Sequence, residues 1–307
     1  RDSIELNQIT LINLDDSEDA DLNISPPHSS NLIYGANGND VIYGGAESQN
    51  IYGWRGNDSL YGESGDDYLD GGIGDDILYG GYGLDRLIGG RGDDRIYGEQ
   101  GDDLLYGNGG NDVIDGGGGD DTLDGGDGSD RMIGGEGNDT YTFGNGIDVI
   151  DYSTLQESIT LVRGGTVDKG ELGTDTFTDF YERIIATSNT NDWIDGLTGG
   201  GSIASLNIDL STNSLTVSNL PGIGSFTSLV EGFENVRGSN TADQIVGDNG
   251  VNTLIGNGGN DVIDGGGGDD TLDGGAGNDE IKGGDGSDQM IGGEGNDTYT
   301  FGNGIDV

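Results

Sequence analysis

A nine-residue unit rich in glycine and aspartate repeats without a gap from Gly35 to Thr142. Two neighbouring units, 71–79 (GGIGDDILY) and 80–88 (GGYGLDRLI), show glycine at positions 1, 2 and 4, aspartate at position 6 and a large apolar residue at position 8. A unit this short cannot bury a core alone, so stacked units must share one. The repeat therefore predicts a solenoid whose turns lie about 4.8 Å apart.

Positions 7 to 9 of each unit predict a three-residue strand with the central side chain pointing inward. The glycines at positions 1, 2 and 4 favour tight turns, so positions 1 to 6 are expected to lie outside the strands. In the first array the inward residues are Ile42, Ile51, Leu60, Leu69, Leu78, Leu87, Ile96, Leu105, Ile114, Leu123, Met132 and Tyr141. The bulkier Tyr141 is expected to end this stack and, with Phe143, to cover the open end of the core.

Position 6 indicates the chemistry of the repeat, because stacking the turns also stacks carboxylates. Like charges at this separation repel by about 1 kcal/mol per pair even in a water-like dielectric, so a cation must lie between them. Carboxylate and carbonyl oxygens select a hard cation, and flexible high coordination favours Ca²⁺ over Mg²⁺. The aspartates predicted as metal ligands are Asp40, Asp58, Asp67, Asp76, Asp85, Asp94, Asp103, Asp112, Asp121, Asp130, Asp139, Asp243, Asp261, Asp270, Asp279, Asp288 and Asp297.

The nonapeptide pattern GGxGxDxUx resembles the RTX, or haemolysin-type, calcium-binding repeat. The resemblance covers about 170 residues in two arrays of nineteen nonads in all. It implies an all-β fold, a parallel β-roll or right-handed β-solenoid, in which two nonads make one turn. It also implies multiple Ca²⁺ ions, each held between loops two nonads apart by position 6 aspartates and by backbone carbonyls.

Departures from the repeat predict the domain organisation. We expect an N-terminal strand and linker at 1–34, a first roll at 35–142, a β-rich spacer at 143–237, a second roll at 238–300 and the start of a further spacer at 301–307. Some nonads depart from the pattern. Gln49 and Asn252 replace position 6 aspartates, while Glu47 and Thr241 replace position 4 glycines, so weaker cation sites are expected at these loops.

The second array repeats the first almost verbatim, with one nonad added. Residues 256–273 equal 107–124, whereas 292–307 equal 134–149, so the offset grows by nine. Because one nonad is half a turn, the segment after the second array is expected to leave from the opposite face. The strand-like segments between the arrays are expected to cap one roll and to start the next.

Charge and composition restrict the partners. The chain of 307 residues carries 58 acidic and 11 basic side chains, a formal charge of -47. This excess argues against nucleic acid and anionic membranes as partners, and it predicts disorder in the absence of metal. The chain has no cysteine, no stretch suited to span a membrane and no signal-peptide pattern, and it is expected to be an internal fragment of a longer protein.

No catalytic constellation stands out in the sequence, so the segment is predicted not to be an enzyme. His28, the only histidine, falls in a linker containing Pro26 and Pro27. The G-x-G-x-x-G matches precede no helix-forming stretch, the Arg91-Gly92-Asp93 tripeptide is part of an ordinary nonad, and the spacing of an EF-hand is absent.

Three classes of function remain open. The first is a calcium-triggered module of a secreted or cell-surface protein, exported by the type I secretion machinery and folded outside the cell. The second is an accessory C-terminal module of a secreted lipase, protease or polysaccharide epimerase, as the resemblance implies. The third is an adhesin or surface-layer binding module that contacts a cell-surface polysaccharide or protein.

The third class has one specific candidate surface. Tyr43, Tyr61, Tyr79 and Tyr97 recur at position 9 of alternate nonads, so they are expected to form a ladder of rings on one outer face. The ladder is interpreted as cross-strand stacking that stabilises the sheet, with an aromatic binding surface as the alternative. An ice-binding surface is disfavoured, because position 3 of the loops lacks a regular threonine.

Overall fold

The computed structural model describes residues 10–11, 23–24, 31–162, 166–177, 183–196, 205–220 and 224–307. Most of the predicted segment 1–34, including the linker around His28, lies outside these residues. Contacts divide the chain into an N-terminal unit, residues 1–150 and 172–179, and a C-terminal unit, residues 151–171 and 180–307. Within the described ranges the regular elements are strands and two 3-10 turns, Gly170–Leu172 (η1) and Leu210–Thr212 (η2).

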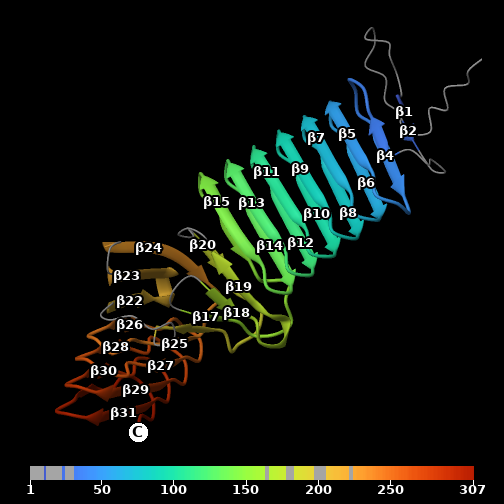
Figure 1. Ribbon diagram of the computed structural model, residues 1–307. Helices are drawn as coiled ribbons and strands as arrows, with labels where there is room; N and C mark the ends of the chain where they lie inside the picture. Colours follow the sequence, from blue (N-terminus) through green and yellow to red (C-terminus); the bar gives the residue numbers. More distant parts are fainter. Residues whose placement is uncertain are drawn as a thin grey trace, which may run out of the picture. The chain divides into compact units, whose positions relative to one another are not determined.

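The N-terminal unit consists of two sheets whose paired strands run parallel (Figure 1, blue to green). One sheet has the order β1 (Thr10–Leu11), β3 (Leu32–Tyr34), β5 (Asn50–Arg55), β7 (Tyr68–Ile73), β9 (Arg86–Arg91), β11 (Leu104–Gly109), β13 (Thr122–Asp127), β15 (Thr140–Asn145) and β19 (Thr174–Phe177). The other has the order β2 (Asn23–Ile24), β4 (Val41–Gly45), β6 (Ser59–Ser64), β8 (Ile77–Tyr82), β10 (Arg95–Gln100), β12 (Val113–Gly118), β14 (Arg131–Glu136) and β16 (Val149–Asp151).

The strand register confirms that two nonads make one turn. Ile96 of β10 pairs with Leu78 of β8 on one side and with Ile114 of β12 on the other. Paired residues are thus 18 positions apart, which is the length of two nonads. Successive nonads alternate between the two sheets, so the predicted parallel β-roll is the observed fold.

The core of the N-terminal unit is built from the position 8 side chains of successive nonads. All twelve side chains predicted to point inward, from Ile42 to Tyr141, have a relative exposure of 0%. The burial pattern along a typical strand such as β7 alternates between buried and half-buried, as expected for a strand with one face toward the core. The apolar position of the repeat therefore builds the shared interior.

The strands of this unit are longer than the sequence predicted. From β5 to β15 each strand has six residues and covers positions 7 to 9 and 1 to 3 of the repeat. The expectation that positions 1 to 6 lie outside the strands was wrong for positions 1 to 3. Past the bend at position 1, the ladder resumes between positions 2 and 3 of neighbouring turns, as in the pairs of Trp54 with Gly72 and Arg55 with Ile73.

The expectation that Tyr141 ends the stack was also wrong. β15 pairs with β19, and this places Phe177 next to Tyr141 in the ladder. The Phe177 ring centroid lies 5.7 Å from that of Tyr141 and 6.2 Å from that of Phe143. The excursion between β15 and β19 breaks the nine-residue period, so periodicity alone could not find the added strand.

The C-terminal unit also contains two sheets. One has the order β18 (Thr166–Asp168), β17 (Thr160–Val162), β21 (Trp193–Asp195), β25 (Asn235–Arg237), β27 (Thr253–Ile255), β29 (Thr271–Ala276) and β31 (Gln289–Glu294). The other has the order β20 (Arg183–Ile185), β24 (Gly224–Glu231), β23 (Ser214–Leu220), β22 (Ser205–Asp209), β26 (Gln244–Val246), β28 (Val262–Asp264), β30 (Glu280–Lys282) and β32 (Thr298–Thr300).

Antiparallel pairs interrupt the parallel order in this unit. β17 pairs with β18, and β23 pairs with both β22 and β24, in antiparallel fashion. From β25 onward the strands run parallel with the 18-residue register, as in the pair of Val236 with Leu254. The strand just before Gly238, β25, is thus hydrogen-bonded in the same way as those of the second array.

The added nonad has the predicted effect. In the N-terminal unit, the Thr-Tyr-Thr segment at 140–142 lies in the same sheet as β13. In the C-terminal unit, β29 is the sequence equivalent of β13, yet the matching Thr298–Thr300 lies in the sheet opposite to it. One extra half-turn has transferred this segment to the other face.

The tyrosine ladder of the N-terminal unit is present as predicted. The ring centroids are 4.6 Å apart for Tyr43 and Tyr61, 5.0 Å for Tyr61 and Tyr79, and 4.8 Å for Tyr79 and Tyr97, with interplanar angles of 10°, 4° and 10°. Because the rings stack face to face, the faces between neighbouring tyrosines are covered and are not available to a ligand. The geometry favours cross-strand stabilisation over an open aromatic platform.

Candidate metal centre

Each of the predicted metal ligands lies in a loop, at the residue directly before a strand. In the N-terminal unit the aspartates form two columns, because alternate nonads belong to opposite sheets. The first column is Asp40, Asp58, Asp76, Asp94, Asp112 and Asp130, and the second is Asp67, Asp85, Asp103, Asp121 and Asp139. In the C-terminal unit the columns are Asp243, Asp261, Asp279 and Asp297, and Asp270 and Asp288.

Hydrogen bonds through one carboxylate oxygen join the members of each column. The N–H of Asp94 donates to Oδ1 of Asp112 at 2.8 Å, and the N–H of Asp112 donates to Oδ1 of Asp130 at 2.8 Å. The same bond recurs along both columns of both units, from Asp40 to Asp58 and from Asp243 to Asp261. Each aspartate thus fixes the loop of the preceding turn.

The second carboxylate oxygen has no partner in most of these residues. Oδ2 is buried and without a hydrogen bond in Asp58, Asp67, Asp76, Asp85, Asp94, Asp103, Asp112, Asp121, Asp130, Asp261, Asp270, Asp279 and Asp288. An unpaired buried carboxylate oxygen is costly, since desolvation is not repaid by a hydrogen bond or a positive charge. A column of such atoms requires neutralisation by a proton or a cation.

The position 1 glycine makes room for a second oxygen beside each of these atoms. A Cβ added to Gly107 would overlap both Oδ2 of Asp112 and the carbonyl oxygen of Gly125. The same pair of oxygens surrounds Gly53, where they belong to Asp58 and Gly71. A carboxylate oxygen and a carbonyl oxygen of the next turn therefore converge beside the same Cα atom, with no side chain between them.

Burial raises the pKa of these carboxyl groups. Desolvation raises the pKa of Asp94 to about 8 and that of Asp121 to about 8, with neighbouring aspartates adding to the effect. The N–H bond to Oδ1 acts in the opposite direction, yet the pKa of Asp112 is still raised to about 7. Without a bound cation, the folded columns disfavour ionisation near neutral pH.

The donor set fits Ca²⁺. Both types of convergent atom are hard oxygens, and Ca²⁺ accepts six to eight of them from carboxylates and backbone carbonyls. In the described part of the chain, no three side chains of Asp, Glu, His or Cys gather around one point. A site of this kind must therefore draw most of its ligands from the backbone, which suits Ca²⁺ better than Zn²⁺.

The first turn of one column in each unit differs from the turns that follow. Oδ2 of Asp40 accepts the N–H of Ala36 at 2.7 Å, and Oδ2 of Asp243 accepts the N–H of Ser239 at 2.6 Å. These two carboxylates have a backbone donor where the later ones have none. Their requirement for a cation is therefore weaker than that of Asp58 and Asp261, whose Oδ2 atoms are buried without a partner.

A tyrosine hydroxyl lies beside the last predicted aspartate of one column in each unit. Tyr141 donates its hydroxyl to Oδ2 of Asp175 at 3.2 Å. A Cβ on Gly134 would overlap this hydroxyl and Oδ2 of Asp139 together. Asp297 and Tyr299 have the same relation to Gly292. Beside Oδ2 of these two aspartates lies a tyrosine hydroxyl, whereas in the turns before, the atom beside Oδ2 is a carbonyl oxygen of the next turn.

The two amide residues at position 6 behave differently from each other. Oε1 of Gln49 is buried and has no hydrogen-bond partner, as in the neighbouring aspartates, but it carries no charge. The side chain of Asn252 is satisfied, since Nδ2 donates to the carbonyl of Glu234 at 2.9 Å and Oδ1 accepts the N–H of Asp248 at 2.9 Å. Asn252 therefore needs no cation.

Three further aspartates continue the columns and were not among the predicted ligands. Asp148, Asp175 and Asp306 accept the N–H groups of Asp130, Asp139 and Asp288 at 2.9, 3.0 and 3.2 Å. Asp148 and Asp306 keep the nine-residue spacing, so the sequence carried a signal for them. Asp175 follows Asp139 by 36 residues rather than 18, and no periodic pattern reveals it.

Position 5 forms a second ladder of hydrogen bonds, which was not predicted from the sequence. Its Asn, Asp and Ser side chains accept the N–H of the same position in the next turn, as Asn57 does for Asp75 at 3.1 Å and Asp93 does for Asn111 at 2.8 Å. These side chains are exposed. Because neutral Asn and Ser serve as well as Asp, this ladder fixes the loops without requiring a cation.

Comparison with protein families gives one match. The RTX calcium-binding nonapeptide repeat (4 copies) matches residues 29–48, 46–78, 79–114, 115–150, 237–272 and 273–307. These segments span both arrays and more than half of the chain. No curated protein matches the sequence.

Proposed function

The chain belongs to the family of RTX calcium-binding nonapeptide repeats, and from this premise we propose that it is a module whose folding is driven by Ca²⁺ outside the cell. The repeats bind calcium, and their number implies multiple ions. The fold is a structural calcium-binding β-roll rather than a typical enzyme fold. The coupling of binding to folding, the route of export and the location are the proposed parts.

The row of unpaired buried carboxylate oxygens is the observation that carries the proposal. A chain with a formal charge of -47 gains little from collapse, and folding would bury further carboxylates with no counter-charge. Ca²⁺ supplies positive charge and oxygen coordination at these positions. Because the sites exist only when two turns are stacked, the free energy of binding is also free energy of folding.

The calcium dependence supports a role outside the cell. Extracellular calcium modules work with dissociation constants of about 10⁻⁴–10⁻³ M, so their sites stay empty in a calcium-poor cytosol. A chain that remains unfolded there suits passage through the type I secretion machinery, which we propose as its route to the medium or the cell surface. Within the described ranges, no helix has the length and hydrophobicity to cross a bilayer.

Two other roles are compatible with folding on Ca²⁺ binding, and they differ in the task of the folded module. As an accessory module of a secreted lipase, protease or polysaccharide epimerase, the roll would stabilise a catalytic domain. As an adhesin or surface-layer module, it would present a binding surface. The C-terminal unit carries a hollow lined by Trp193, Asp195 and Arg237 among others, which favours the binding role of the two.

A calcium titration tests the proposal. The purified chain is stripped of metal and followed by far-UV circular dichroism while Ca²⁺ is added, with Mg²⁺ as the control cation. We expect the β signal to appear cooperatively with Ca²⁺ at about 0.1–1 mM and not with Mg²⁺ at the same concentration. A chain that is compact and protease-resistant in excess EGTA contradicts the proposal.

A further inference from the structure

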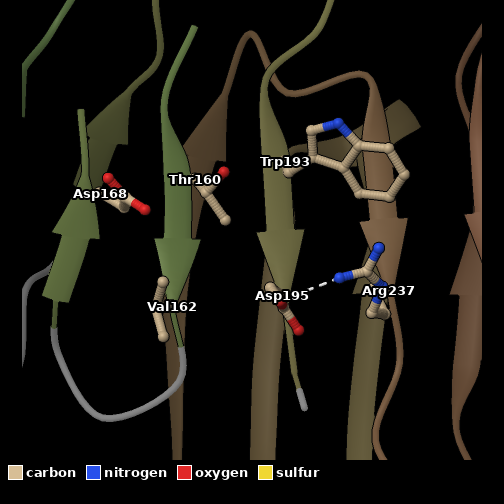
Figure 2. A pocket seen from close by; sticks show the side chains of 6 residues that line it. All are labelled: Thr160, Val162, Asp168, Trp193, Asp195 and Arg237. Carbon is tan, nitrogen blue, oxygen red and sulfur yellow. Dashed lines mark hydrogen bonds and ion pairs between the residues drawn. The ribbon is translucent and has the colours of Figure 1, made fainter. Parts of the chain in front are cut away.

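A hollow opens on the outer face of one sheet of the C-terminal unit. It has a volume of about 330 Å³ and is lined by Thr160, Val162, Asp168, Trp193, Asp195 and Arg237. Figure 2 shows these side chains on four neighbouring strands, β18, β17, β21 and β25. The hollow is separate from the position 6 columns, since none of its residues is a predicted calcium ligand.

The strand register explains why these side chains meet. Thr160 pairs with Trp193, and Val162 pairs with Asp195, which in turn pairs with Arg237. Residues that pair in a parallel sheet point to the same face, and residues two apart on one strand share that face. The outward side chains of β17, β21 and β25 therefore line one surface, and the antiparallel β18 adds Asp168 at its edge.

Interactions among the lining residues hold the aromatic wall in place. Nη1 of Arg237 is 3.2 Å from Oδ2 of Asp195, and Cζ of Arg237 lies 5.3 Å from the centroid of the Trp193 ring. Nε1 of Trp193 donates to Oδ1 of Asn191 at 3.3 Å. The ring is thus fixed by a cation–π contact and a hydrogen bond before any ligand arrives, which lowers the entropy lost on binding.

The calcium repeat does not account for this set of residues. β17, β18 and β21 precede the second array, where the nonad pattern places no constraint on outward side chains. Trp193 is one of two tryptophans in the chain, and the other, Trp54, lies in the N-terminal unit. Trp54 lies in a nonad of the first array, whereas Trp193 lies on β21, outside both arrays, so the repeat does not explain Trp193 and its neighbours.

Electrostatics narrow the class of ligand. Asp168 and Asp195, together with the large negative charge of the chain, repel anions. Arg237 neutralises Asp195 at 3.2 Å, and no three metal-ligating side chains gather in the described part of the chain, so the hollow does not fit a metal cation. A neutral ligand rich in hydroxyl groups can bind both the negative and the positive side chains, because the carboxylates accept its O–H groups and the guanidinium donates to its oxygens. The Trp193 ring offers an apolar surface with a negative face that suits C–H groups.

We propose that this hollow binds one or two sugar rings of a neutral glycan. Its volume lies at the lower end of the range of about 300–1,000 Å³ typical of small-ligand sites, which suits a short saccharide segment. Trp193 packs against the C–H face of one ring, while Asp168, Asp195 and Arg237 bind its hydroxyl groups. The partner is thus a polysaccharide or a glycosylated surface, and the site is independent of the calcium columns.

Tryptophan fluorescence offers a direct test. In the variant Trp54→Phe, Trp193 is the only tryptophan, so its emission reports on the hollow. The calcium-loaded variant is titrated with neutral oligomers of glucose, mannose and N-acetylglucosamine, and with an alginate oligomer as an anionic probe. We expect a saturable change in emission with at least one neutral oligomer and none with alginate.

Variants of the lining residues complete the test. Asp168→Asn and Thr160→Val are expected to weaken binding of that oligomer at least tenfold, as measured by calorimetry. Asp273→Asn is the matched control, because Asp273 lies on the strand β29 outside the hollow. Far-UV circular dichroism in Ca²⁺ is recorded for each variant, so that a folding defect is distinguished from lost binding.

Three outcomes would overturn the inference. The first is the absence of a saturable response to all neutral oligomers in a protein that folds normally with Ca²⁺. The second is an equal loss of affinity in Asp168→Asn and Asp273→Asn. The third is a response to alginate alone, which would indicate binding through calcium. In each case the cross-strand contact of Trp193 and Arg237 would be a stabilising pair only.

Discussion

Asp94 and Asp112 are joined by one hydrogen bond, from the N–H of Asp94 to Oδ1 of Asp112 at 2.8 Å, while Oδ2 of Asp112 is buried without a partner. The two oxygens of one carboxylate thus have different tasks. Oδ1 holds the loop of the preceding turn, and Oδ2 is left for a cation. This division distinguishes position 6 from position 5, where exposed oxygens accept an N–H and need nothing else.

Substitutions at the neighbouring residues Asp93 and Asp94 distinguish the roles of positions 5 and 6 in calcium binding. Asp94→Asn removes the charge beside the buried oxygen, so we expect a higher Ca²⁺ concentration at the folding midpoint, by a loss of about 1–3 kcal/mol for the affected site. Asp93→Asn keeps an oxygen that accepts the N–H of Asn111, as Asn57 does for Asp75, and should leave the midpoint unchanged. Equal shifts in the two circular-dichroism titrations would contradict this assignment of position 6.

Two neighbouring glycines test the loop backbone. Gly110 has a φ of 144°, and a Cβ there would overlap the carbonyl oxygen of Gly92. Gly110→Ala should lower the unfolding free energy by about 1–3 kcal/mol or more. A Cβ on Gly109 meets no atom closer than 3.9 Å, so Gly109→Ala should be neutral or stabilising by about 0.4–1 kcal/mol. Thermal unfolding in saturating Ca²⁺ checks both, and similar melting temperatures would count against the loop geometry.

The metal-free chain should respond to pH. Burial raises the pKa of Asp94 and of Asp121 to about 8, from 3.8 in the unfolded chain. Between these values the folded state binds more protons than the unfolded state, so its stability decreases as pH rises. After removal of metal on a chelating resin, we expect more β signal at pH 5 than at pH 8. The double variant Asp94→Asn, Asp121→Asn should show a smaller difference, and a β signal that increases toward pH 8 would refute the argument.

Calcium stoichiometry tests the role of Tyr141. Its hydroxyl lies beside Oδ2 of Asp139 and donates to Oδ2 of Asp175, so it supplies a hydrogen bond that Oδ2 lacks in the turns before. Tyr141→Phe keeps the ring and removes the hydroxyl, so native mass spectrometry should count one additional bound ion. Tyr97→Phe, which removes a hydroxyl from the outer ladder, should leave the number unchanged. An unchanged count in both variants would show that the site at Asp139 does not depend on this hydroxyl.

Regular features of the nonad were accessible from the sequence. Position 8 predicted the core from Ile42 to Tyr141, and position 9 predicted the ladder from Tyr43 to Tyr97, because one 18-residue period governs both. The family and the roll follow from the same period. The ligand role of the position 6 aspartates stays a prediction; the structure shows their placement and the unpaired Oδ2 atoms of most of them.

Irregular features were not accessible in the same way. Asp175 and Phe177 join the N-terminal unit after an excursion that hides the period, so Tyr141 was wrongly expected to end its stack. The extension of strands through positions 1 to 3 depends on pairing between turns, which propensity within one nonad does not reveal. The hollow beside Trp193 depends on which strands become neighbours, and no spacing in the sequence indicates this.

The bond from Asp94 to Asp112 gives each column a polarity. At position 6 every turn donates its buried amide hydrogen to the turn on its C-terminal side and accepts one from the turn on its N-terminal side, whereas the exposed position 5 bonds run in the opposite direction. Loss of a turn from the C-terminal side leaves a buried amide donor without an acceptor. Loss of a turn from the N-terminal side leaves a carboxylate oxygen without its donor, and a proton or an ion can bind there instead. The two ends of a buried position 6 column are therefore not equivalent: its C-terminal end requires a further turn to accept an amide hydrogen, and its N-terminal end does not.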